Sequence, residues 1–172
     1  MRALVLAVVL AVAGCSAQAA QETSGTAATP PDLSATDLAF VDLVIPQNES
    51  ALAALALARP GSALRPVADR VAATYQAELV RLRDVLARAG RPESDQHEGH
   101  DMPGMITAAE LASLEHSPDA DEQLRTLLRT QFEEARTVAR AELASGRHQP
   151  VRDLGASIDR TRAEFLALLG AA

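Results

Sequence analysis

The sequence predicts an all-α protein in which four long amphipathic helices form an antiparallel bundle. Apolar residues recur at the spacing of one helix face over four segments of the chain. Alanine, the best helix former, is abundant, and proline or glycine stands at the ends of these segments. The 172 residues suffice for one domain and are too few for two ordinary ones. Two short connections and one long central linker therefore suit a single antiparallel bundle.

The first half of the chain contains the first two predicted helices. The first covers 37–58, and Ser34 or Thr36 can cap its start. The second opens with Pro66 in its first turn and ends at Gly90. The short connection between them implies that these two helices are antiparallel neighbours.

The second half repeats this arrangement after a short extra helix. Thr107 and Glu110 fit a capping box that opens the short helix. The third long helix is predicted from 117–118 to Gly146, and the fourth starts at Pro150. An offset of 84 residues aligns much of the two halves, which indicates an internal duplication.

Polar residues stand on the predicted core faces at matching places in the two halves. Gln47 and Asn48 in the first helix correspond to Gln131 in the third, while Glu78 corresponds to Glu164 at an offset of 86. Such a layer can be a metal site between helices or a hydrogen-bonded core layer. Because no helical Glu has a His three positions later, we favour the hydrogen-bonded layer over a di-iron site.

The N-terminus predicts export from the cytoplasm. Residues 1–14 join one positive charge to an apolar run that is too short to span a bilayer, as in a secretion signal. Val12-Ala13-Gly14-Cys15 resembles the lipobox of bacterial lipoproteins, which implies lipidation of Cys15 and membrane anchoring. The alternative is a plain secreted protein with a free thiol. Residues 15–32 are predicted to be a disordered tether, and 33–172 the bundle domain.

The central linker, 91–106, carries the one cluster of metal-ligand side chains in the sequence. His97 and His100 stand close to Met102 and Met105 in a segment rich in Gly, Pro and Asp. Imidazoles combined with thioethers favour Cu(I), so we take these four residues as a candidate copper site. The spacing does not match a structural zinc motif, and a solvated acidic loop explains the composition equally well.

Composition excludes several classes of function. The net charge of −7 and the 2% aromatic content argue against a nucleic-acid partner. A single Cys excludes an intramolecular disulfide and a Cys-built zinc site. We find no arrangement typical of nucleophilic or acid–base catalysis and expect the protein not to be an enzyme. His116 and His148 lie alone near helix ends and are interpreted as surface residues.

The motifs together resemble the bacterial domain of unknown function family 305. The resemblance covers about residues 36–169 and rests on the segments 40–52, 75–79 and 100–107 in this order. It implies a ferritin-like four-helix bundle that is secreted or lipid-anchored. It also implies that the protein binds or handles a metal, particularly copper, in the cell envelope.

This chain departs from the family pattern at the paired histidines. The family's His-His pairs correspond here to Gln47-Asn48 and to Gln131-Phe132. The implied copper binding therefore carries over to the His/Met linker alone.

Three functional hypotheses follow. The first is a lipid-anchored envelope protein that binds a copper ion through the linker. The second is a scaffold that binds another envelope protein or a second copy of itself without a metal, through a face with Arg59, Arg65, Arg81, Arg83 and Arg88. The third, least favoured, is a ferritin-like oxidase.

Overall fold

The structure is a computed structural model that describes residues 32–94 and 102–171. This part of the chain is helical and contains no strand, which confirms the predicted all-α class. Five helices follow one another, the third of them short: α1 (Ala35–Ala56), α2 (Arg65–Arg88), α3 (Ala108–His116), α4 (Ala120–Ser145) and α5 (Gln149–Ala171). The predicted signal peptide, Cys15, His97 and His100 lie outside the described residues, so the boundaries at 14 and 32 stay predictions.

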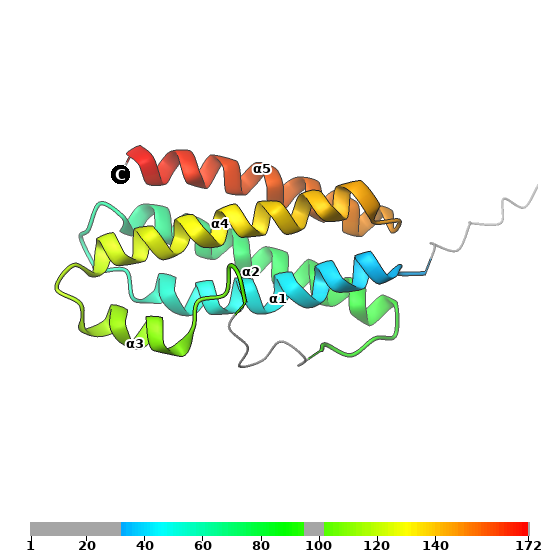
Figure 1. Ribbon diagram of the computed structural model, residues 1–172, viewed down its shortest axis with the longest axis horizontal. Coiled ribbons are helices and arrows are strands. Elements are labelled where there is room, and N and C mark those ends of the chain that lie inside the picture. Colours follow the sequence, from blue (N-terminus) through cyan, green and yellow to red (C-terminus); the bar gives the residue numbers. More distant parts are fainter. Residues whose placement is uncertain (1–31, 95–101, 172) are drawn as a thin grey trace, which may run out of the picture.

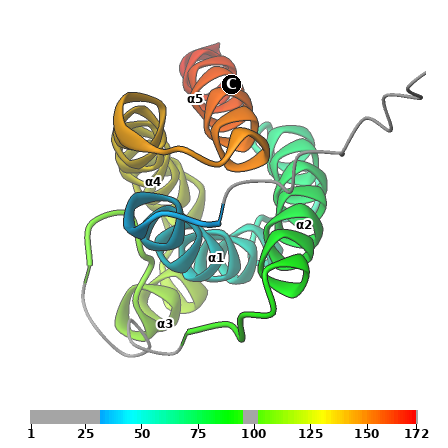
Figure 2. The same cartoon turned by 90° about the vertical axis from the view of Figure 1, so that its right-hand side faces the viewer.

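The four long helices form the predicted antiparallel bundle (Figure 1). Viewed from its end, α4 and α5 pack side by side, α1 lies against α2 and α4, and α2 closes the bundle against α5 (Figure 2). Every neighbouring pair of long helices runs in opposite directions (Figure 1). The short helix α3 lies outside the bundle, against α1 and α4.

Local sequence signals set most helix boundaries. Ser34 caps α1 and Thr107 caps α3, each in a capping box with the acidic residue three positions later. The start of α4 differs from the prediction, because the helix begins at Ala120 rather than at 117–118. Ser117 keeps an extended backbone (ψ 133°), since the following proline disfavours the helical conformation for the residue before it.

A layer of polar side chains divides the hydrophobic core into two halves. One half lies at the end with the α1–α2 turn and includes Tyr75, Phe132 and Phe165. The other lies at the end where α1 begins and includes Phe40 and Ile158. On α1, α2 and α5, the buried residues Asn48, Glu78 and Arg162 stand between the members of the two halves. The fully buried polar layer is therefore the feature of the core that calls for explanation.

The helix α1 is long and apolar enough to cross a membrane by length and composition. Half of its most apolar 18-residue window is buried inside the bundle, however, and α1 supplies side chains to both halves of the core. These contacts identify α1 as a core helix, because a core helix passes the same test of length and hydropathy.

Candidate functional site

The central polar layer is built around the guanidinium group of Arg162 on α5. This side chain is fully buried and binds the carboxylate of Glu78 on α2 with both of its terminal nitrogens, at 2.7 Å each. The amide oxygen of Asn48 on α1 accepts from the same guanidinium at 2.9 Å, and the Asn48 amide donates to Glu78 at 3.0 Å. Paired N–H···O bonds of this kind are among the strong polar contacts in proteins.

Two further residues extend the network to α4. The Arg162 guanidinium stacks over the ring of Tyr75, with its central carbon 3.9 Å from the ring centre. The hydroxyl of Tyr75 donates to the side-chain oxygen of Gln131. Burial raises the pKa of Tyr75 above its usual range, so this hydroxyl stays protonated. Burial would lower the pKa of Arg162, but the contacts with Tyr75 and Glu78 outweigh it and raise that pKa.

The network confirms the hydrogen-bonded interpretation of the polar layer. Arg162 places a permanent positive charge between the carboxylate of Glu78 and the amide oxygen of Asn48. Within residues 32–94 and 102–171, no group of three or more His, Cys, Asp or Glu side chains could hold a metal ion. Gln47 and Asn48 are buried amides, and Phe132 is a core aromatic residue.

One predicted member of the layer was wrong. Glu164 lies on the surface, where its half-exposed side chain approaches Arg70 at 3.6 Å. The buried residue of α5 in the polar layer is instead Arg162, which the sequence analysis did not select. The offset of 84 residues relates Glu78 to Arg162, so extending that offset along the chain could have found it.

The end of the central linker forms a tight turn that is docked on the bundle. The backbone N–H of Met105 donates to the carbonyl of Met102 at 3.0 Å, and Gly104 between them has a φ of 79°. Proline followed by a glycine with positive φ is the signature of a type II turn. The turn places the two thioether-bearing residues at its first and last positions, and both side chains are partly exposed.

Polar contacts with α1 hold this turn in place. The side-chain amide of Gln47 donates to the carbonyl of Pro103 at 3.0 Å, and the hydroxyl of Ser50 accepts from the N–H of Ile106 at 3.1 Å. Gly104 fits between α1 and α4 so closely that a Cβ there would lie 2.8 Å from the Cβ of Glu134. The structure therefore fixes Met102 and Met105 beside one another, while the placement of His97 and His100 is outside its scope.

Most of the arginines considered as a partner-binding face have partners within the chain. Arg59 donates to the carbonyls of Ser117 and Pro118, Arg65 pairs with Asp69, and Arg88 pairs with Asp84. Arg83 binds Glu49 and Glu93. These contacts neutralise much of that face. Arg81 lines a hollow of about 440 Å³ over α2.

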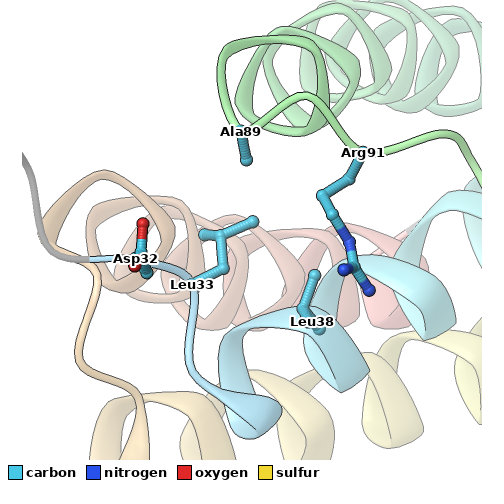
Figure 3. A pocket seen from close by; sticks show the side chains of 5 residues that line it. All are labelled: Asp32, Leu33, Leu38, Ala89 and Arg91. Atoms are coloured by element: carbon cyan, nitrogen blue, oxygen red, sulfur yellow. The ribbon is translucent and has the colours of Figure 1, made fainter.

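A second hollow lies where the chain enters the bundle (Figure 3). It has a volume of about 190 Å³ and is lined by Asp32, Leu33 and Leu38 near the start of α1 and by Ala89 and Arg91 after α2. The lining combines apolar side chains with one carboxylate and one guanidinium. It contains neither a nucleophile paired with a base nor a set of metal ligands, so it indicates no catalytic chemistry.

The protein is thus a small antiparallel helical bundle with a hydrogen-bonded polar core and a Met102–Met105 turn docked on α1. The chain belongs to the DUF305 family, described as "Domain of unknown function (DUF305)", whose family model matches residues 37–170. No curated protein matches the chain.

Two solved structures show the same fold. A DUF305 fragment from Deinococcus radiodurans is 22% identical, with a TM-score of 0.73, over 82% of this chain and 97% of that one. A DUF305 protein from Streptomyces coelicolor that is described as secreted is 17% identical, with a TM-score of 0.70, over 78% of this chain and 89% of that one. At these identities the likeness shows the fold alone.

Proposed function

We propose that this protein is an exported, lipid-anchored bundle that binds a soft metal ion, with copper favoured, through its central linker. The observation that supports this proposal most directly is the Met102–Met105 turn. It holds two thioether side chains at partly exposed positions against α1 and α4, in a linker that also carries His97 and His100. Thioether sulfur combined with imidazole nitrogen favours Cu(I) over hard cations.

The polar layer of the core is already occupied by Arg162, so we place the proposed metal site on the linker instead. An ion that entered the polar layer would have to displace the Arg162 guanidinium from its carboxylate and amide partners. Breaking such a buried pair costs about 3–5 kcal/mol. A site on the linker leaves the core intact. Because the linker is partly exposed, a bound metal ion can be released and replaced readily, which suits a store, scavenger or carrier of metal ions. In this proposal the protein carries the metal ion as its cargo and does not use it to transfer electrons or chemical groups.

Export and anchoring rest on the N-terminal sequence, with support from a relative. The apolar run and the lipobox-like Val12-Ala13-Gly14-Cys15 favour a lipoprotein of the bacterial cell envelope. The structurally similar Streptomyces protein is described as secreted. A bundle tethered in this way would meet metal ions outside the cytoplasm.

Copper binding is tested by anaerobic Cu(I) titration against a competing chelator. The full-length chain should carry Cys15→Ser, because a free thiolate would itself bind Cu(I). We expect stoichiometric uptake that weakens by at least about tenfold, or roughly 1.4 kcal/mol, in either Met102→Leu/Met105→Leu or His97→Ala/His100→Ala. Leucine keeps the volume of methionine without its sulfur, and His116→Ala on the exposed end of α3 is the matched control.

A spectroscopic readout identifies the ligands directly. The chain has three methionines, Met1, Met102 and Met105, so methyl NMR of the linker pair is simple to assign. Cu(I) should shift both linker methyl signals. Unchanged signals together with unchanged affinity in both double variants would contradict metal binding here, and the alternative of a metal-free scaffold would then be favoured.

Lipid anchoring is tested separately. We expect the wild-type protein expressed in a bacterium to incorporate labelled palmitate and to sediment with membranes. Cys15→Ser should abolish the label and release the protein, since two or more acyl chains are needed for a stable anchor. An unlabelled wild-type protein in the soluble extracytoplasmic fraction would show plain secretion instead.

A further inference from the structure

Two buried carboxyl groups meet at the end of the bundle where α1 begins and α4 ends. Asp37 on α1 and Glu142 on α4 are both fully buried. One oxygen of Asp37 accepts the backbone N–H groups of Arg147 and His148 at 3.0 Å each. The other accepts the N–H of Ser34 at 2.6 Å. Asp37 thereby ties the first turn of α1 to the turn between α4 and α5.

The carboxyl group of Glu142 has no such donors. Among the described residues, no N–H or O–H group donates to either of its oxygens. Its carboxyl group lies against Gly146, next to the Arg147 N–H that binds Asp37, which brings the two carboxyl groups to the same turn. A Cβ on Gly146 would lie 1.8 Å from one of these oxygens, and a Cβ on Gly155 would lie 3.3 Å from its Cγ. Glycine at these two positions therefore makes room for the Glu142 side chain.

A proton shared between the two groups accounts for this arrangement. Two buried carboxylates in contact cannot both be charged without a large cost, and an acid that donates to its neighbour removes that cost. Asp37 already accepts three N–H groups, which favour its charged form. The proton then belongs to Glu142, whose O–H donates to Asp37.

The other charged and titratable groups around the pair support this assignment. Arg152 on α5 is the cation near Glu142, but its guanidinium donates to the carbonyl of Gly146 at 3.0 Å. The buried Nδ1 of His148, in the α4–α5 turn, has no hydrogen-bond partner within residues 32–94 and 102–171. Burial, the hydrogen bond with Asp37 and the charge of Asp37 raise the pKa of Glu142 to about 7, against a smaller opposite effect of Arg152.

The same surroundings act in the opposite direction on Asp37. Burial alone would raise its pKa, but the hydrogen bonds from Ser34, from the His148 N–H and from Glu142 outweigh burial and lower the pKa of Asp37 to about 2. The two pKa values are thus pushed apart, which is the pattern of a carboxyl pair that holds one proton.

We propose that Asp37 and Glu142 form a proton-binding site that fastens the start of α1 to the α4–α5 turn, and that losing this proton loosens that end of the bundle. The site is a pH-sensitive fastening and does not depend on the metal chemistry proposed above. Its occupant is one proton, supplied by the solvent and returned to it.

The sign of the pH dependence follows from the two shifts. Because the pKa of Glu142 is raised in the folded state, its contribution to stability is complete below its ordinary value of 4.5 and is lost as the pH rises through about 7. The pKa of Asp37 is lowered, so its contribution is present above 3.8 and is lost as the pH falls through about 2. The pair is therefore most stabilising in mildly acidic solution.

Thermal unfolding of the full chain between pH 5 and pH 8 tests the proposal. Relative to wild type, Glu142→Gln should remove an alkaline decrease in Tm of roughly 5–10 °C, because the amide donates to Asp37 at every pH. Glu133→Gln, an exposed position on α4, and His148→Gln are the matched controls and should keep the wild-type decrease. Backbone NMR gives the local readout, since the Arg147 and His148 amide signals should titrate near pH 7 in wild type and not in Glu142→Gln.

Three outcomes would overturn the proposal. The first is a wild-type Tm that changes with pH in parallel with that of Glu142→Gln. The second is loss of the pH dependence of Tm in His148→Gln, which would show that the imidazole of His148, and not Glu142, causes that dependence. The third is recovery of the Tm at pH 8 on adding Ca²⁺ or Zn²⁺, which would show that a cation rather than a proton occupies the pair.

Discussion

Replacing Arg162 by methionine is expected to lower the free energy of unfolding by about 3–5 kcal/mol, since it leaves the carboxylate of Glu78 buried without its cation. Asn48 would keep one hydrogen bond to that carboxylate, which is too little to compensate a buried charge. Chemical unfolding followed by circular dichroism measures the loss. The single tyrosine of the chain, Tyr75, is an additional probe, because the guanidinium lies over its ring.

A double variant tests whether Glu78 and Arg162 stabilise the fold as an interacting pair or as two independent residues. Glu78→Gln/Arg162→Met removes both charges and should recover part of the stability lost in Arg162→Met, as expected for residues in one network. The exposed pair Arg70 and Glu164 connects the same two helices and provides the control, for which the double exchange should cost about 1 kcal/mol or less. A loss below about 1 kcal/mol in Arg162→Met would contradict the buried ion pair.

Truncating Phe132 to alanine should have a comparable effect, a loss of about 3–5 kcal/mol. Its fully buried ring meets the ring of Tyr75 edge-on, with centres 6.5 Å apart, and lies 5.6 Å from that of Phe165. These three rings join α2, α4 and α5 next to the polar layer. Alanine would leave a cavity at their junction and remove the aromatic contacts.

Urea unfolding gives the stability of Phe132→Ala, and Val80→Ala is the matched control. Val80 is the one large apolar side chain that the described residues expose, at 69%, so its truncation should change stability by less than about 0.5 kcal/mol. An equally small effect of Phe132→Ala would show that this position is not part of the rigid core.

The polar layer shows where sequence patterns reach their limit. Helical spacing directed Gln47 and Asn48 inward, and both are buried as predicted. The offset of 86 residues selected Glu164 instead of Arg162, which stands at the offset of 84 that aligns the rest of the two halves. The inward place of Arg162 depends on Glu78, which stands 84 residues away in the sequence.

For the candidate linker site, too, the sequence predicts the local turn but not the residues that hold it on the bundle. Pro103 and Gly104 predict a turn, but the chain positions that hold it, Gln47 and Ser50, precede it by 56 residues. No periodicity connects such distant residues. The candidate copper ligands His97, His100, Met102 and Met105 were selected by side-chain chemistry alone, and the structure describes two of them, Met102 and Met105, in a turn on the bundle.

Patterns along the chain were enough to predict the four long helices, the capping box of α3, the order of the segments and the all-α class. These depend on interactions within a few residues and on the helical period, so they can be read along the chain. The tertiary structure decided which polar residues share the core, which arginine is buried, and that Asp37 meets Glu142. The physical reason is that a buried charge is tolerated only beside its partner, and packing alone brings partners from distant helices together.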